Sequence, residues 1–244
     1  MIRHLPEAPT GIRPLAPGDG IDAHHHDTHQ IAYARTGVLS VTTRAGAWVA
    51  PASRAIWIPA GTVHEHRAYG RTDLRLVGLP VADNPLRLDR PAVLVVGPLL
   101  RELLIACTDG QVAGQEAARM RAVLLDRLRR APEHAVHLPW PQDPRLAAAC
   151  AVLRDDPGAQ VTLASLAASA GASGRTLTRL FQAELGLSFP QWRTQLRLHH
   201  ALILLAGGEP VTTVAHACGW ASASAFIDVF RRAFGHTPGR AFTV

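Results

Sequence analysis

The sequence predicts an α+β protein of two domains, a small β-barrel or sandwich and an all-α domain, with a short helical segment between them. Three observations predict this arrangement. Runs of β-branched and aromatic residues separated by turn signals fill residues 30–79. Apolar residues take up helical spacing from Pro98 onward. The C-terminal part of the chain contains the same helix-turn-helix pattern twice.

The composition is that of a globular protein with an anionic partner. Hydrophobic residues make up 48% of the 244 residues, which suffices for packed cores. The formal charge is +6, and all 25 basic residues are arginine. Arginine suits bidentate contacts with phosphate and guanine, although GC-rich codon usage also accounts for much of this bias.

Cysteine usage and the absence of apolar segments indicate the compartment. Cys107, Cys150 and Cys218 are odd in number and widely spaced, so we expect free thiols in a reducing environment. The first residues lack the apolar core of a signal peptide, and no apolar run is long enough to span a bilayer. We therefore expect a soluble, cytoplasmic protein with no membrane partner.

Residues 1–97 are expected to form the first domain. Residues 1–20 are rich in Pro and Gly and are expected to be irregular. The runs with β propensity that follow are separated by turn signals such as Ala45-Gly46, so they predict short antiparallel strands. These runs are residues 30–35, 37–43, 47–49, 55–58, 74–77 and 93–96.

Residues 98–137 are expected to be helical and to link the domains. Two apolar stripes with helical spacing lie there, and they either cover the barrel or pair with a second copy of the chain; we favour a homodimer. The stripes are Leu99, Leu100, Leu103 and Leu104, and Met120, Val123, Leu124 and Leu128. Three prolines in 138–144 forbid a continuous helix, so the last domain is expected at 143–244.

The two helix-turn-helix units cover residues 163–181 and 211–230. Each has a short Ala-rich helix, a glycine where the chain must turn, a serine that can cap the next helix, and a second amphipathic helix. The turn glycines are Gly171 and Gly219, and the capping serines are Ser173 and Ser222. Two such helices on one face can enter successive major-groove segments of B-DNA, roughly 34 Å apart.

Longer motifs follow one another in order through this region. They include Leu163-x-x-Leu166-Ala167, Ser173-x-Arg-Thr-Leu177-x-Arg179-Leu-Phe181, Glu184-Leu-Gly186, Arg197-Leu-x-x-Ala201, Ala215-x-x-x-Gly219 and Phe226-x-x-x-Phe230-Arg231. With these motifs, residues 145–242 resemble the DNA-binding domain of the AraC/XylS family of transcription regulators. Trp220 stands where that family usually has Phe or Tyr. The resemblance implies a double-stranded DNA operator as a partner and makes RNA polymerase a candidate second partner.

The expected DNA contacts are the exposed polar positions of the second helix in each unit. Arg175 and Arg179 are four residues apart and share a helix face, for which a solvated basic face is the alternative interpretation. The resemblance implies that this first helix carries most of the base readout. The candidates are Ser173, Gly174, Arg175, Thr178 and Arg179 in the first unit, and Ala223, Ser224, Ile227, Asp228 and Arg231 in the second, with Arg232 and Arg240 as further phosphate contacts.

The first domain carries a second set of motifs. His24-His25-His26 is followed by Gln30 and Gly37, and then by Pro59-x-Gly61-x-x-His64. These patterns resemble cupin barrels, the sensor domains of many AraC-type regulators, in which His-x-His, a Glu and a later His gather around a metal. The resemblance implies a cupin-like β-barrel and a candidate divalent transition metal on His24, His26 and His64, with Gln30 at the usual Glu position.

Two further interpretations of these histidines stay open. A His-rich stretch is often a solvated loop, and many regulator cupins hold an organic ligand in the barrel without a metal. Alternate residues of a strand share a face, so His24 and His26 can converge, and His66 is an additional candidate if it shares a strand with His64. We expect a pocket for a small-molecule effector formed by His24, His26, Gln30 and His64.

The sequence as a whole therefore predicts a ligand-responsive, sequence-specific transcriptional regulator that is not an enzyme. A metal-dependent cupin enzyme fused to a DNA-binding domain is the alternative, against which Gln30 argues because a neutral amide is a weaker metal ligand than a carboxylate. A nucleoid-type DNA binder without an effector is a third hypothesis.

Overall fold

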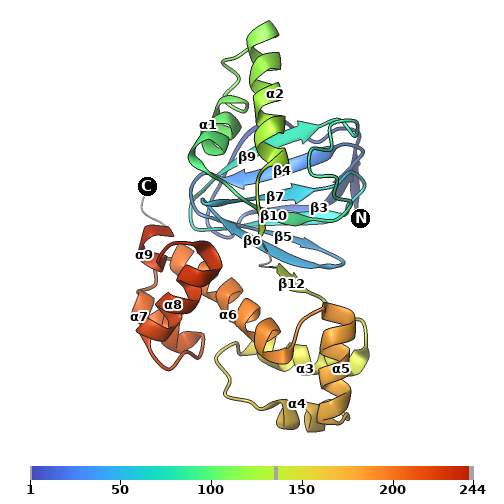
Figure 1. Cartoon of the computed structure of the whole chain (residues 1–244), viewed down its shortest axis with the longest axis vertical. Helices are drawn as coiled ribbons and strands as arrows, with labels where there is room; N and C mark the ends of the chain where they lie inside the picture. The colour runs from blue at the N-terminus through green and yellow to red at the C-terminus, as the bar shows by residue number, and fades with distance from the viewer. Residues whose placement is uncertain (1, 135–136, 242–244) are drawn as a thin grey trace. The chain divides into compact units, whose positions relative to one another are not determined.

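The computed structural model describes residues 2–134 and 137–241 and divides the chain into two compact units (Figure 1). The second unit consists of Ala45–Ala47 and Leu138–Gly239, and the first unit holds the rest. The first unit is rich in β-strands and the second is helical with two helix-turn-helix units, so the predicted fold class is confirmed.

The strands form two six-stranded sheets. Their orders are β1-β3-β8-β5-β6-β12 and β11-β10-β7-β4-β9-β2. The strands are β1 (Arg3–Leu5), β2 (Gly11–Leu15), β3 (Gly20–His26), β4 (His29–Ala34), β5 (Val38–Thr43), β6 (Gly46–Pro51), β7 (Arg54–Ile58), β8 (His64–Tyr69), β9 (Thr72–Leu79), β10 (Ala92–Val95), β11 (Glu133–His134) and β12 (His137–Pro139).

Strand β4 shows how the first unit is layered, because all its residues are buried. Ala32 and Ala34 pack into the core between the sheets, together with Trp48 and Ile56. The alternate residue Tyr33 faces the opposite side of the sheet, in a second core. A strand buried on both faces reads as a continuous apolar run, as residues 31–34 do.

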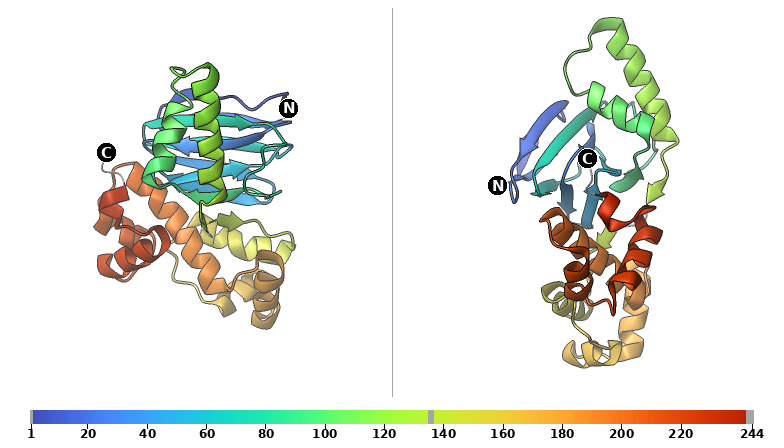
Figure 2. Two further views of the ribbon diagram at one scale, coloured as in Figure 1. Left: turned by 45° about the horizontal axis from the view of Figure 1, so that its top comes forward. Right: turned by 90° about the vertical axis from the view of Figure 1, so that its left-hand side faces the viewer.

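Helices α1 (Pro98–Ala106) and α2 (Gly114–Arg129) lie across the outer face of the second sheet (Figure 2). Most residues of the two apolar stripes are buried in that outer core: Leu100, Leu103, Leu104, Leu124 and Leu128. Leu99 is 50% exposed and Val123 41% exposed. The stripes therefore chiefly cover the second sheet of the first unit. Leu99 and Val123 are the stripe residues left exposed for contact with another chain.

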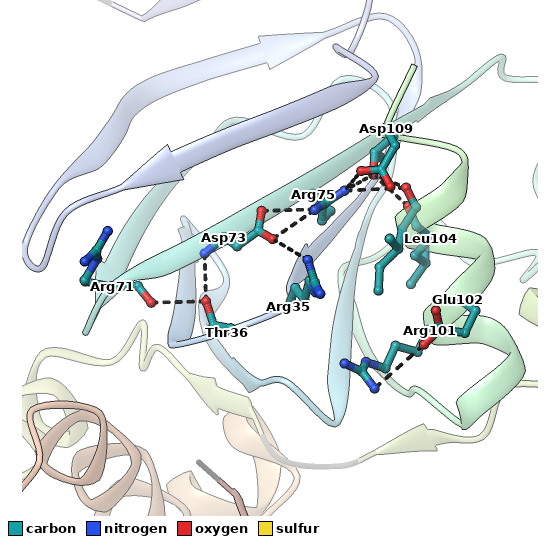
Figure 3. Close-up of polar contacts among 11 residues, drawn as sticks. Arg35, Thr36, Arg71, Asp73, Arg75, Arg101, Glu102, Leu104 and Asp109 are labelled. Atoms are coloured by element: carbon teal, nitrogen blue, oxygen red, sulfur yellow. Dashed lines mark hydrogen bonds and ion pairs between the residues drawn. The ribbon is translucent and has the colours of Figure 1, made fainter. Parts of the chain in front are cut away.

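A buried arginine links α1 to the sheet (Figure 3). Arg75 on β9 forms an ion pair with Asp73 at 3.0 Å and another with Asp109, which follows α1. It also donates to the Thr108 hydroxyl at 3.2 Å. Removing one partner of a buried charge leaves the other uncompensated, so this network holds the end of α1 against β9.

The expectation of an irregular N-terminus is wrong, because residues 1–20 contain β1, β2 and the start of β3. Strand β1 runs parallel to β3, and β2 pairs antiparallel with β9. Both are the last strand at one edge of a sheet, where Pro14 can be accommodated because an edge strand does not need every N–H. The partners lie far away in the chain, so the local Pro- and Gly-rich composition was misleading.

The helices of the second unit surround a core that includes Leu177, Phe181 and Trp192. Phe226, Phe230 and Phe234 are buried along one face of a single helix. The helices are α3 (Pro144–Asp155), α4 (Leu163–Ser169), α5 (Gly174–Leu185), α6 (Phe189–Ala206), α7 (Val211–Ala217), α8 (Ala223–Phe234) and α9 (Pro238–Ala241). Within the described residues, no helix combines the length and apolarity that crossing a bilayer requires.

Candidate functional site

The first helix-turn-helix unit, α4–α5, is built from local capping signals. Gly171 turns the chain with φ +61°, a left-handed conformation that favours glycine. The Ser173 hydroxyl then accepts a hydrogen bond from the Thr176 amide at 3.1 Å and caps α5. At the other end Gly186, with φ 65°, closes the helix. The turn and caps predicted from the sequence are confirmed here.

The second unit, α7–α8, repeats these devices. Gly219 has φ +77°, Ser222 accepts from the Ala225 amide at 3.2 Å, and Gly235 ends α8 with φ 81°. Gly219 also lies in a crowded place, since an added Cβ would stand 2.7 Å from the Gly158 carbonyl oxygen. The two units thus present two helices with fixed starts and ends.

The exposed face of α5 carries Arg175, Thr178 and Arg179. Within the described part of the chain, neither arginine forms an ion pair or an intramolecular hydrogen bond. The Thr178 hydroxyl donates to the Gly174 carbonyl at 2.9 Å, and the Ser173 hydroxyl is engaged in the cap. The two guanidinium groups are therefore the donors that this face offers to another molecule.

The two arginines of α6, in contrast, have structural contacts. Arg193 donates to the Val161 carbonyl at 3.3 Å, and Arg197 donates to the Pro157 carbonyl at 3.1 Å. Both lie on α6 and hold the loop between α3 and α4. The contrast separates arginines that build the domain from the two on α5 that remain available.

The corresponding face of α8 is less basic. Ala223 and Ile227 are half-buried, whereas Ser224 and Asp228 are exposed. Arg231 forms an ion pair with Asp228 at 3.2 Å. Of the further phosphate candidates, Arg232 is exposed, and the Arg240 side chain lies outside the described residues. On α8, therefore, one of the two exposed arginines is paired with an aspartate, whereas both arginines of α5 are unpaired.

In the first unit, three histidines meet between β3 and β8. These strands pair antiparallel with His24 opposite His64, and His26 follows on the same face of β3. One ring nitrogen from each of His24, His26 and His64 lies within 4.8 Å of the others, and all three rings are buried. His25 faces the other way and stacks on His4 with ring centroids 4.7 Å apart.

Backbone carbonyls set the orientation of all three rings. The Nδ1 atoms of His24, His26 and His64 donate to the carbonyls of Asp22, Thr28 and Thr62 at 2.7, 2.8 and 2.8 Å. Because a carbonyl only accepts, each Nδ1 carries the proton and each Nε2 keeps its lone pair. Burial lowers the pKa of all three imidazoles, that of His64 to about 3, so the rings are neutral near pH 7.

Two further polar groups line or adjoin this cluster. Gln30 on β4 is fully buried, and among the described residues its amide has no hydrogen-bond partner other than the neighbouring His26 ring. His66, two residues after His64 on β8, is also buried with both ring nitrogens unpartnered, and its centroid lies 5.0 Å from that of His64. Three neutral imidazoles held by backbone carbonyls fit a divalent transition metal, which commonly takes such nitrogen ligands.

A cavity of about 370 Å³ opens beside the histidines, and we call it the sensor cavity. His24 and Gln30 lie in its wall, together with Arg3 from β1 and Arg13 from β2. Sequence reasoning missed both arginines because their strands were not recognised. The alternation of Arg13 with Leu15 in residues 11–15 was the one local signal of a shared strand face.

The chain matches two family models. The model of the AraC-like ligand binding domain matches residues 8–82, and that of a helix-turn-helix domain matches residues 166–243. The HTH-type transcriptional regulator NimR of Escherichia coli K12 is 33% identical over 223 residues, which are 89% of this chain and 80% of that protein.

Two further similarities cover a smaller share of the chain. The HTH-type transcriptional regulator RipA of Corynebacterium glutamicum is 37% identical over 100 residues, 41% of this chain and 30% of that protein. A solved DNA-binding transcriptional dual regulator from Escherichia coli K-12 is 32% identical and covers 41% of this chain and 95% of that chain, with a TM-score of 0.37.

Proposed function

The chain belongs to the AraC family of transcriptional regulators, and from that premise we propose that it reads its operator chiefly through α5. Arg175 and Arg179 would bind base edges in the major groove, with Ser173 and Thr178 near the DNA backbone. Helix α8 would dock more weakly, through Ala223, Ser224, Ile227, Asp228 and Arg231.

The observation that carries this proposal is the pair of unpaired guanidinium groups on a helix capped at both ends. A guanidinium presents a rigid fork of donors that matches the O6 and N7 acceptors of guanine. A fixed helix limits the orientations of these forks, and defined orientation is what discriminates one base from another. The other exposed polar groups of α5 are the Thr178 hydroxyl, which is bonded within the helix, and the side chains of Gln182 and Glu184 toward its C-terminal end.

The test begins with selection of binding sites from random duplexes by the full chain. Arg179→Ala should then weaken binding to the selected site about tenfold or more and relax the preference at one base position. Arg71→Ala, in the exposed turn before β9, removes the same charge and should leave affinity unchanged. Equal weakening on every sequence would make Arg179 a phosphate contact and overturn its role in base readout.

We further propose that the first unit holds a divalent transition metal on His24, His26 and His64, with Gln30 beside it, and takes the small effector in the sensor cavity. A bound metal would supply a Lewis-acidic centre for an electron-donating group of the effector. The Nδ1 atoms are bonded to backbone carbonyls, which leaves the Nε2 lone pairs free, and one ring nitrogen from each histidine lies within 4.8 Å of the others; both observations support this assignment.

Metal analysis of zinc-loaded full-length protein tests the assignment. The His24→Ala/His26→Ala variant should lose the metal yet keep basal DNA binding, which depends on the other unit. His25→Ala is the matched control, because that ring faces away from the cluster and should leave metal content unchanged. Wild-type protein that retains no zinc after loading and gel filtration would refute the metal site.

The remaining proposals concern organisation. We propose domains at 1–97, 98–137 and 143–244, a homodimer formed through α1 and α2, and a cytoplasmic regulator without catalytic activity. The exposed Leu99 and Val123 support the dimer surface. Leu99→Ser/Val123→Ser should shift a dimer toward monomer in sedimentation at micromolar concentration. A wild-type monomer under those conditions would refute the interface.

A further inference from the structure

The sensor cavity lies where the edge strands of the two sheets bring basic side chains to its wall. Strand β1 ends the first sheet and β2 ends the second. The cavity is lined by residues of both, and by His24 on β3, Gln30 on β4 and Leu76 on β9. Each of these strands contributes alternate residues to the face between the sheets, so the register decides which side chains reach the cavity.

The register directs two arginines to that face. Arg3 pairs with His24 in the parallel β1–β3 ladder, so the two side chains share one face of the sheet. Arg13 lies two residues before Leu15, which belongs to the core between the sheets, and both arginines line the cavity. Neither forms an ion pair within the described residues. Among the described residues that line the cavity, one side chain is acidic, that of Asp22, and it is exposed.

Deeper in the wall, hydrogen-bonding capacity is unused. The Gln30 amide is fully buried, and among the described residues it has no hydrogen-bond partner other than the neighbouring His26 ring. Buried polar groups are almost always satisfied, so such groups beside a cavity indicate a ligand or water that completes them. Leu5, Ile21 and Leu76 supply the apolar part of the lining.

We propose that the effector of this chain carries a carboxylate, which Arg13 and Arg3 bind at the mouth of the cavity while its apolar body reaches Gln30 and Leu76. Guanidinium groups bind carboxylates through paired, charge-assisted hydrogen bonds, and two of them without an acidic partner favour an anion over a neutral ligand. A cavity of about 370 Å³ matches a small organic acid. The inference rests on the proposal that this cavity is the effector site.

Benzoate and its neutral counterpart benzamide test the chemistry directly. Calorimetric titration of the metal-stripped full chain should show benzoate binding at millimolar affinity, weakened by salt, and benzamide binding about tenfold more weakly or not at all. Arg13→Gln should weaken benzoate binding about tenfold, and Arg3→Gln/Arg13→Gln should abolish it. Arg71→Gln, in the exposed turn before β9, is the matched control and should bind benzoate like the wild type.

The outcomes separate this inference from the proposals on which it stands. Equal affinity for benzoate and benzamide, no benzoate binding, or an unchanged Arg13→Gln variant would overturn the carboxylate. If zinc loads on the histidines but benzoate fails, the carboxylate inference alone is wrong. If zinc does not load while benzoate binding still depends on Arg13, the metal proposal is wrong and the carboxylate inference holds.

Discussion

The units α4–α5 and α7–α8 share one frame and differ in the surface they present. In both, a glycine with positive φ makes the turn, a serine caps the second helix and a glycine closes it. Both second helices have 12 residues. Yet α5 exposes Arg175 and Arg179 without partners, whereas α8 exposes Asp228 in an ion pair with Arg231 and leaves only Arg232 unpaired among its described side chains.

This comparison indicates that the residues that stabilise such a unit differ from the residues that we propose to contact DNA. Turn glycines and capping serines act through backbone geometry that both units need. Charges on the exposed face contribute little to folding, so they can differ between two copies of one frame. Substitutions in the first set should lower stability, and substitutions in the second should change DNA binding alone.

The largest expected effect distinguishes the two turn glycines. Gly171→Ala and Gly219→Ala should each cost about 1–2 kcal/mol, because alanine is strained at positive φ. At Gly219 an added Cβ would also stand 2.5 Å from Arg197 Nη2 and 2.7 Å from the Gly158 carbonyl oxygen, whereas it meets nothing within 4 Å at Gly171. Overpacking should add about 1–3 kcal/mol at Gly219.

Urea unfolding of the helical unit, followed by circular dichroism in the full chain, measures both glycine variants. Equal losses for the two would contradict the role assigned to the contact with the α3–α4 loop.

The next effect concerns DNA affinity. Arg175→Ala should cost about 1–3 kcal/mol of binding free energy on the selected site, as expected for loss of a bidentate base contact. Arg231→Ala should cost less than about 1 kcal/mol of binding free energy, because the Arg231 guanidinium already forms an ion pair with Asp228. Fluorescence anisotropy with the same duplex compares the two variants. A larger loss for Arg231→Ala would mean that α8, rather than α5, dominates recognition.

The capping serines should behave alike in the two units. Ser173→Ala and Ser222→Ala each remove one acceptor for an orphan helix amide, so each should lower the free energy of unfolding by about 1 kcal/mol. Thermal unfolding monitored by circular dichroism measures both. Ser173→Ala with unchanged stability but weaker DNA binding would show that this hydroxyl serves the DNA rather than the helix.

The smallest effect should be a gain. Asp228→Ala removes a negative charge from the face of α8 and frees Arg231 for phosphate, so DNA affinity should rise by about 0.5 kcal/mol. Anisotropy titrations at two salt concentrations should show the gain and a steeper dependence on salt. Weaker, less selective binding would instead indicate that Asp228 accepts a hydrogen bond from a cytosine amino group.

Other regions show where sequence patterns were sufficient and where they were not. The runs at 30–35 and 55–58 lie in β4 and β7 because their β-branched and aromatic residues need no distant information to favour strands. The apolar stripes of α1 and α2 were also correct as helices, but their partner was not decided by pattern. Leu104 and Leu124 look the same whether they face a sheet or a second chain.

Features that depend on neighbouring residues could be predicted from the sequence: helix periodicity, the turns at Gly171 and Gly219, and the caps at Ser173 and Ser222. The wall of the sensor cavity could not be predicted in this way, because it forms only when the strands pair. Arg3, Arg13 and Gln30 meet there because β1 pairs with β3, β2 with β9, and the two sheets face each other. Each of these ladders joins an edge strand to an inner strand that is distant in the sequence, and such a pairing leaves no periodic signal in a Pro- and Gly-rich segment.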